Sequence, residues 1–290
     1  MRNLFSFGCS FTSFKYPTYV DYLSPYFDQT YNYGRPGSGN KSIFNKIVRL
    51  IYEKKIKKND YVTIQWSSLA REDIMINNGW DSGGLITNSP LFDNHYIQKY
   101  FSVNQKGDEL LSYIVALLSL LKSEGINFKW FYMLEPWISN VMGEPGEIPN
   151  ELIKKYKEAS ESGVLEDLKM VVDENYINSI ESFILNSDID FREKLTYYYE
   201  NENHIHGDDH PSPYCHFLFS KYVLNSFDLK NDLFDDMLYK NSVDWTSYIT
   251  NKNEIFKIES DFNKNYGRRI NYINNEHPYL RWPSKIQDFL

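Results

Sequence analysis

The sequence contains few of the residues that mark several classes of protein. Its 290 residues include only two cysteines, Cys9 and Cys215, which are too few for a disulfide framework, and we expect both thiols to be reduced. No run of Lys and Arg is long enough to form a basic face, and the formal net charge of -8 disfavours a nucleic-acid partner. The most apolar stretch, residues 110–121, is too short to span a bilayer, and the apolar start at residues 4–7 is too short for a secretory signal. These absences predict a soluble, cytoplasmic protein.

What the sequence does contain is an alternation of short apolar runs and amphipathic segments. The apolar runs predict buried strands at residues 4–7, 30–33, 61–66 and 126–134. Apolar residues at helical spacing predict helices over residues 18–23, 41–55, 109–121 and 214–227. Strands and helices alternate as they do in βαβ units. The sequence therefore predicts an α/β fold, a doubly wound three-layer α/β/α sandwich around a central, mostly parallel sheet.

The remaining segments are less regular. Residues 72–104 lack clear periodicity and contain several glycines, while prolines interrupt residues 135–200, so we expect both to be insertions. Residues 228–290 are polar but end in aromatic residues, which favours an extension that packs on the core. We therefore expect one α/β domain at residues 1–227, with these two insertions, followed by the C-terminal extension.

The first dozen residues hold the first candidate for chemistry. The apolar run stops abruptly after Phe7, at Gly8-Cys9-Ser10, which places Ser10 at the tip of a turn that follows a buried strand. Enzymes of the α/β class present nucleophiles from such turns, because the backbone amides after the strand point into the crevice at the carboxyl edge of the sheet. The alternative is that Ser10 only caps the helix that follows.

Two further segments follow predicted strands and are expected at the same edge of the sheet. Residues 32–40, NYGRPGSGN, contain three glycines and a proline, which mark a tight loop whose backbone can approach a ligand closely. The helix after this loop is expected to direct its amino-terminal amides into the same crevice. Polar residues also follow the third strand, from Ser67 to Arg71.

A histidine-rich segment, HIHGDDHPS at residues 204–212, precedes the last predicted helix of the core. In the most ordinary interpretation it is a helix start capped by Ser212, and its histidines, like His216 further on, serve surface or packing roles. Alternating positions also fit a metal site, although no second cluster of ligands accompanies them: His204, His206, Asp208 and His210. We expect neither a metal nor a cofactor.

Taken in order along the chain, these segments resemble the sequence blocks of the SGNH, or GDSL-type, hydrolase superfamily over roughly residues 1–225. The first block, FGCSFT, keeps Gly8 and Ser10 but has Cys9 where the family motif has Asp. The resemblance implies a flavodoxin-like SGNH hydrolase fold with Ser10 as the nucleophile. It also implies an oxyanion hole in which the amides of Ser10 and Gly37 donate hydrogen bonds.

The third block departs from the family pattern. The family carries an Asn there whose side chain completes the oxyanion hole, whereas this chain reads Gln65-Trp66-Ser67-Ser68. A replacement donor would have to come from one of four nearby polar residues: Ser67, Gln65, Arg71 or Asn40.

The last block also departs from the pattern, in which the catalytic His follows an Asp by three positions, because position 207 is Gly. The resemblance implies that His210 is the base. We expect Asp208 to orient it, since residues two apart in an extended segment point to the same side. Asp209 is expected to face solvent or to cap a helix that begins at Pro211.

Together these assignments predict a serine esterase or acyl-transfer enzyme with a Ser-His-Asp mechanism. Hydrolysis and acyl transfer share an acyl-enzyme, and the sequence does not separate them. Aromatic residues make up 17% of the chain and suit contact with carbohydrate, so the expected substrate is an O-acyl (O-acetyl) group of a carbohydrate or another small acyl ester. The altered third block leaves one alternative, a catalytically silent glycan-binding protein of the same fold.

Overall fold

The computed structural model describes residues 2–14, 16–76, 79–86, 92, 94–137, 150–186, 210–229, 235–251 and 270–272. Its centre is a five-stranded sheet with the order β6-β3-β1-β2-β7, in which every strand runs parallel to its neighbours. The strands are β1 (Asn3–Phe7), β2 (Gln29–Asn32), β3 (Tyr61–Trp66), β6 (Asn127–Tyr132) and β7 (Ile270–Tyr272). The predicted parallel sheet is thereby confirmed.

The strand β1 lies in the middle of this sheet. The chain passes from β1 to β2 on one side and then crosses to β3 on the other, so that Leu4 pairs with Thr30 and with Tyr61. In open parallel sheets, the loops on either side of such a reversal form a crevice at the carboxyl ends of the strands. The segments that follow β1, β2 and β3 are therefore the ones placed to form a site.

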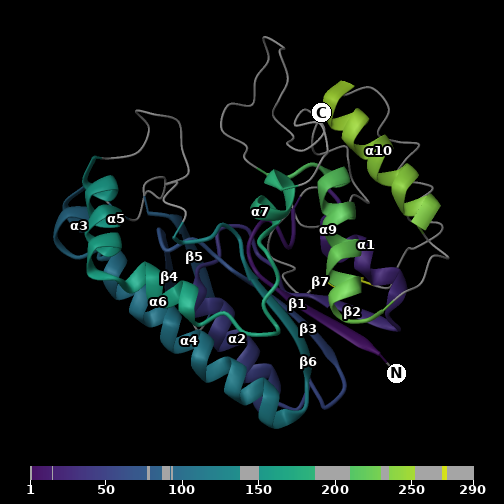
Figure 1. Cartoon of the computed structure of the whole chain (residues 1–290), viewed down its shortest axis with the longest axis horizontal. Coiled ribbons are helices and arrows are strands. Elements are labelled where there is room, and N and C mark those ends of the chain that lie inside the picture. Colours follow the sequence, from purple (N-terminus) through teal and green to yellow (C-terminus); the bar gives the residue numbers. More distant parts are fainter. Residues whose placement is uncertain are drawn as a thin grey trace.

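Helices cover both faces of the sheet (Figure 1). One face is covered by α2 (Asn40–Tyr52) and α4 (Val103–Glu124), and the other by α1 (Tyr19–Leu23), which is followed by the short 3-10 helix η1 (Ser24–Tyr26), and by α9 (Pro213–Ser226). Alternate residues of β1 enter the two separate cores, because side chains alternate along a strand: Phe5 and Phe7 lie with α2 and α4, and Leu4 lies with α1 and α9. The doubly wound three-layer α/β architecture is thus as predicted.

The helix α4 is longer than its apolar run predicted, because polar residues form its first turns. It begins after Ser102, whose side chain accepts a hydrogen bond from the Gln105 N–H at 3.2 Å and so acts as the N-cap. It ends at Gly125, whose φ of 65° is the left-handed conformation that commonly terminates helices.

The two segments that were predicted to be insertions contain secondary structure of their own. The first holds an antiparallel hairpin of β4 (Arg71–Ile76) and β5 (Gly79–Leu85), which the sequence did not predict, and the short helix α3 (Asn94–Lys99). The second holds α5 (Asn150–Ser162), α6 (Val164–Met170) and α7 (Ile180–Leu185).

The C-terminal extension contributes the helix α10 (Asp235–Asn251), which packs against α9, and the strand β7, which pairs with β2. The division between core and extension at residue 227 stays a prediction. In the described part of the chain, every helix is too short or too polar to cross a bilayer.

Candidate active site

The turn after β1, which we call the β1 turn (residues 8–14), carries Ser10 at the carboxyl end of the sheet. The N–H groups of Thr12 and Ser13 both donate to the Cys9 carbonyl, at 3.1 Å each, and this reverses the chain. Ser10 is only 4% exposed. Its backbone N–H has no hydrogen-bond partner within the described residues. The same residue thus offers a hydroxyl and an uncommitted amide.

The loop after β2 is bound closely to the β1 turn. The N–H of Arg35 donates to the Gly8 carbonyl at 3.1 Å, and the side chain of Asn32 donates to the Thr12 carbonyl at 2.9 Å. A Cβ atom at Gly34 would come within 2.8 Å of the Thr12 side chain, so this close approach requires glycine. These contacts bring the predicted first and second blocks together.

Most backbone N–H groups of this loop already have partners. A turn is closed by the bond from the Ser38 N–H to the Arg35 carbonyl, 3.1 Å long. Pro36 and Gly37 are its central residues, and the φ of 78° at Gly37 is the value that a type II turn requires there. Between residues 33 and 39, all of which are described, the N–H groups with partners belong to Tyr33, Gly34, Arg35, Ser38 and Gly39. Since Pro36 has no N–H, Gly37 carries the one amide of the loop that remains available.

Two amides at the amino terminus of α2, the helix expected to direct its amides into the crevice, are already hydrogen-bonded within the chain, so that expectation fails for these two. The Asp73 carboxylate, from β4, accepts hydrogen bonds from the N–H groups of Gly39 at 2.8 Å and Ser42 at 2.9 Å. Burial raises the pKa of Asp73, while these two hydrogen bonds favour its charged form. The chain itself therefore supplies the anion that such a helix end attracts.

The end of β3 is held by the side-chain amide of Asn40. Its Oδ1 accepts a hydrogen bond from the Ser67 N–H at 2.6 Å, and its Nδ2 donates to the Ser67 carbonyl at 3.1 Å. The Ser67 hydroxyl is buried and has no hydrogen-bond partner in the ranges that the structure covers. Both residues were considered as replacements for the missing oxyanion Asn. The hydroxyl of Ser67 is free to donate, whereas the side-chain amide of Asn40 is already hydrogen-bonded to the backbone of Ser67.

The other two candidates are also bound to segments that form the site. Gln65 is 0% exposed, and its Oε1 accepts hydrogen bonds from the β1 turn. Arg71 is partly buried, and its Nη1 donates to the Ser38 carbonyl at 3.4 Å. Both side chains thus support backbone that lies beside the crevice.

His210 lies against the β1 turn. Its imidazole stacks on the ring of Phe14, with centroids 3.9 Å apart and 13° between the planes, and Phe11 meets it edge-on at 5.2 Å. The Tyr16 hydroxyl donates to the Pro211 carbonyl at 3.1 Å and holds the adjacent residue. The predicted base is therefore brought to the turn that carries the predicted nucleophile, although the two are far apart in sequence.

The last helix of the core was expected over residues 214–227 and begins one residue earlier, at Pro213. Ser212 is its N-cap, accepting a hydrogen bond from the Cys215 N–H at 3.2 Å, and Pro213 is its first residue, so a helix start at Pro211 is wrong. The choice between the two acids as the partner of His210 stays a prediction, as does the metal alternative. These assignments depend on residues outside the described part of the chain: His204, His206, Asp208 and Asp209.

His216 is a packing histidine, in agreement with the ordinary interpretation. It is 0% exposed on α9, and neither ring nitrogen has a hydrogen-bond partner in the described structure. Burial, with a smaller contribution from nearby His210, lowers the pKa of His216 to about 3. The imidazole is therefore neutral in the folded protein at neutral pH.

Both cysteines are free and buried. Cys9 and Cys215 belong to the same apolar cluster, on the α1 and α9 face of the sheet. Since the side chain of Cys9 is 0% exposed, an Asp at this position would bury a charge here. The departure from the family motif thus fits the local packing.

The sequence did not identify Phe14 or Tyr16 as parts of the site. The available signal was their position shortly after Ser10. A segment that carries several aromatic residues is expected to pack them against other parts of the chain. What they pack against includes His210, which is distant in sequence, so no local pattern specifies the contact.

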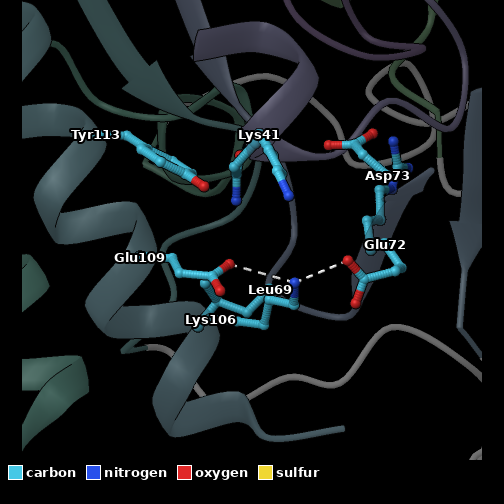
Figure 2. A pocket seen from close by; sticks show the side chains of 9 residues that line it. Lys41, Leu69, Glu72, Asp73, Lys106, Glu109 and Tyr113 are labelled. Atoms are coloured by element: carbon cyan, nitrogen blue, oxygen red, sulfur yellow. Dashed lines mark hydrogen bonds and ion pairs between the residues drawn. The ribbon is translucent and has the colours of Figure 1, made fainter. Parts of the chain in front are cut away.

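A shallow, open hollow lies between α2, β4 and α4 and has Asn40 in its wall. Figure 2 shows the Lys106 ammonium between the carboxylates of Glu72 and Glu109, at 2.8 and 3.3 Å. The lining contains as many cations as carboxylates, and the Lys106–Glu72 pair joins α4 to β4.

Comparisons with known proteins find only distant similarity. No family model and no curated protein matches the sequence. The chain is similar to a member of the lipolytic protein G-D-S-L family from Veillonella parvula, with 12% identity and a TM-score of 0.40 over 79% of this chain and 99% of that one. It is also similar to Axe2, an acetylxylan esterase from Geobacillus stearothermophilus, with 14% identity and a TM-score of 0.38 over 79% of this chain and 94% of that one. Similarity at these TM-scores is too weak to assign a fold or a function. The fold is therefore assigned from the strand order of the sheet, and the candidate site from the contacts among its own residues.

Proposed function

We propose that the chain is a serine esterase of the SGNH type, with Ser10 as nucleophile and His210 as general base. One observation carries this proposal: the amides of Ser10 and Gly37 are uncommitted at the edge of the sheet where His210 packs on the β1 turn. An oxyanion hole needs donors that are fixed in place and not already hydrogen-bonded. The neighbouring amides of the glycine loop all have partners, so these two stand out.

In the proposed reaction, His210 accepts the proton of the Ser10 hydroxyl as the oxygen attacks an ester carbonyl. The tetrahedral intermediate collapses to an acyl-enzyme, and His210 returns the proton to the departing alcohol. Water, or another hydroxyl, then attacks the acyl-enzyme by the same route in reverse. Asp208 holds the imidazole in the correct tautomer and stabilises its protonated form.

The negative charge that develops on the carbonyl oxygen would be met by the amides of Ser10 and Gly37. We propose the Ser67 hydroxyl as the third donor, because it is buried, lies at the end of β3 and has no partner among the described residues. Each such donor typically contributes about 3 to 4 kcal/mol of barrier lowering. A hydroxyl in this role would replace the family's missing Asn.

The substrate that we propose is an O-acetyl or other small O-acyl group of a carbohydrate. Its support is compositional, since aromatic residues make up 17% of the chain and their faces suit sugar rings. A second candidate is a catalytically silent glycan-binding protein. The absence of the third-block Asn favours that alternative.

Hydrolysis of p-nitrophenyl acetate tests the proposal, because this ester needs no sugar-binding contacts. We expect the wild type to release p-nitrophenol well above the uncatalysed rate and Ser10→Ala to return to that rate. Ser13→Ala is the matched control, since it removes a buried hydroxyl from the same turn and should keep most of the activity. Wild-type protein without activity would instead support the glycan-binding alternative.

A further inference from the structure

We infer that Gln65 is a positioning residue for the nucleophile, whose side-chain oxygen holds the β1 turn in the conformation that presents Ser10. The inference rests on the proposed function, which assigns Ser10 its role. Gln65 lies near the end of β3, directly beside β1, and is 0% exposed. A polar side chain at this depth is stabilised by hydrogen bonds to its protein neighbours.

The Oε1 atom of Gln65 accepts hydrogen bonds from both sides of Ser10. It is 3.2 Å from the Cys9 backbone nitrogen and 2.8 Å from Thr12 Oγ1, and the Cys9 thiol is also within reach at 3.3 Å. Cys9 immediately precedes the nucleophile and Thr12 follows it by two positions. One acceptor atom therefore fixes the segment whose central residue supplies the hydroxyl and the oxyanion amide.

The direction of the amide follows from its partners. A backbone N–H can only donate, so the group facing Cys9 must be Oε1 and not Nε2. Nε2 is consequently left buried, without a partner in the described part of the chain. A buried donor without a partner is destabilising, and an apolar side chain would avoid that cost. An amide at this position is explained if its oxygen, Oε1, is needed as a hydrogen-bond acceptor for the β1 turn.

The backbone is shaped to let this amide approach. A Cβ atom at Gly8 would lie 2.7 Å from Gln65 Oε1 and 2.8 Å from its Cβ, closer than real contacts of this kind. Glycine at position 8 thus admits Gln65 beneath the turn. The same residue accepts the Arg35 N–H through its carbonyl, so the contact also adjoins the loop that carries Gly37.

The other partner of Gln65 is itself held by a buried chain of hydroxyl groups. Thr12 Oγ1 lies 3.4 Å from the Tyr19 hydroxyl, which lies 3.5 Å from Thr63 Oγ1, and Thr63 donates to Ser6 Oγ at 2.8 Å. Burial raises the pKa of Tyr19, so its hydroxyl stays protonated and can donate. Thr12 is therefore connected to α1, β3 and β1, and the turn cannot rotate without breaking these bonds.

The test replaces the acceptor while keeping the volume. In Gln65→Met the oxygen is lost, and we expect kcat for p-nitrophenyl acetate to fall about 10- to 100-fold, because small displacements of a reacting group cost rates of this order. KM should change little. The amplitude of the acyl-enzyme burst should stay near one per molecule. Gln65→Glu keeps an oxygen at this position and should recover most of kcat, whereas the exposed Gln105→Met, on α4, should resemble the wild type.

Two results would overturn the inference: a wild-type kcat in Gln65→Met, or a burst amplitude that falls in proportion to activity while the rate per active site is unchanged. The second result would mean that Gln65 only supports folding. If Gln65→Met does not fold, Thr12→Val removes one hydrogen bond of the same contact and should give a smaller loss of kcat with full burst amplitude. A wild-type rate in that variant would equally count against a positioning role.

A readout without catalysis separates this inference from the proposed function. Hydrogen exchange of the Cys9 amide, followed by NMR, should become about tenfold faster in Gln65→Met, since its acceptor is gone, while the amides of β3 keep their protection. Unchanged exchange at Cys9 would contradict the contact itself. Wild-type protein that is inactive but shows this exchange pattern would overturn the proposed function alone.

Discussion

The ring of Phe14 is stacked on the imidazole of His210, with centroids 3.9 Å apart and 13° between the planes. This contact joins the β1 turn to the segment that precedes α9. Stacking restricts the tilt of the imidazole and leaves its two nitrogen atoms at the edge of the stack. In the proposed mechanism, that orientation determines whether the base meets the Ser10 hydroxyl.

We therefore expect Phe14→Leu to lower kcat about tenfold, because aromatic pairs contribute roughly 0.5 to 1.5 kcal/mol beyond the area they bury. KM for p-nitrophenyl acetate should change little. Phe44→Leu is the control, since Phe44 stacks on Tyr113 at 4.7 Å on the α2 and α4 side of the sheet. Equal activity in both variants would show that the stack does not orient the base.

Gly37, the proposed donor to the oxyanion, can be compared with Gly163, a second glycine that also has a positive φ. Gly37 has φ 78° and Gly163 has φ 90°, so alanine at either position should cost about 1 to 2 kcal/mol of stability. A Cβ at Gly163 meets nothing within 4 Å, which makes Gly163→Ala a control for strain alone. We expect only Gly37→Ala to lower kcat, by about 100-fold.

Urea unfolding and steady-state kinetics of the two variants check this prediction. A loss of stability is expected in both variants, because both glycines have a positive φ. If both variants lose the same stability and neither loses kcat, Gly37 does not donate to the oxyanion.

The third donor is tested by Ser67→Ala. Its hydroxyl has no partner in the described structure, so removing it should leave the free energy of unfolding nearly unchanged. If the hydroxyl stabilises the oxyanion, kcat should fall by about 100- to 1,000-fold. Ser68→Ala, the adjacent serine, is the control and should stay within a few-fold of the wild type. A fully active Ser67→Ala would mean that the Ser67 hydroxyl is not the third donor.

How much of this arrangement the sequence predicts depends on whether a feature is local. The strands β1 and β3 were predicted well, because strands buried on both faces are continuous apolar runs. The hairpin of β4 and β5 was not predicted, because its residues are largely polar or glycine. Asp73 of this hairpin accepts hydrogen bonds at the amino terminus of α2, where the sequence predicted amides that face the crevice.

The candidate site divides in the same way. Ser10 and the glycine loop follow strands and were located by that position alone. The contacts that hold them, from Gln65 and Phe14, join residues that are distant in sequence, so no spacing rule could indicate them. The role of Asp208 stays a prediction, with Asp208→Asn expected to cost far more activity than Asp209→Asn.

His216 gives the protein a predictable sensitivity to acid. Its pKa is about 3 in the folded protein, against about 6.5 in the unfolded chain. As the pH falls below about 6.5, the unfolded chain binds a proton that the folded protein does not accept until about pH 3, so the free energy of unfolding decreases. Between pH 7 and 4.5 this loss is on the order of 3 kcal/mol, since each pKa unit corresponds to about 1.4 kcal/mol.

The variant His216→Phe lacks this group in a surrounding that already contains the rings of Tyr16 and Tyr19. Its free energy of unfolding, from urea titrations at pH 7 and pH 4.5, should depend on pH less steeply than that of the wild type. Identical pH dependence in the two proteins would mean that His216 is not held neutral by burial.

The central claim is that Ser10 is a covalent nucleophile, and reaction with a fluorophosphonate probe tests it most directly. Mass spectrometry of the treated protein should find a single adduct per chain, and peptide mapping should place it on Ser10. Ser13→Ala should be labelled like the wild type and Ser10→Ala should not be labelled. An adduct on another residue, or labelling that persists in Ser10→Ala, would contradict the account.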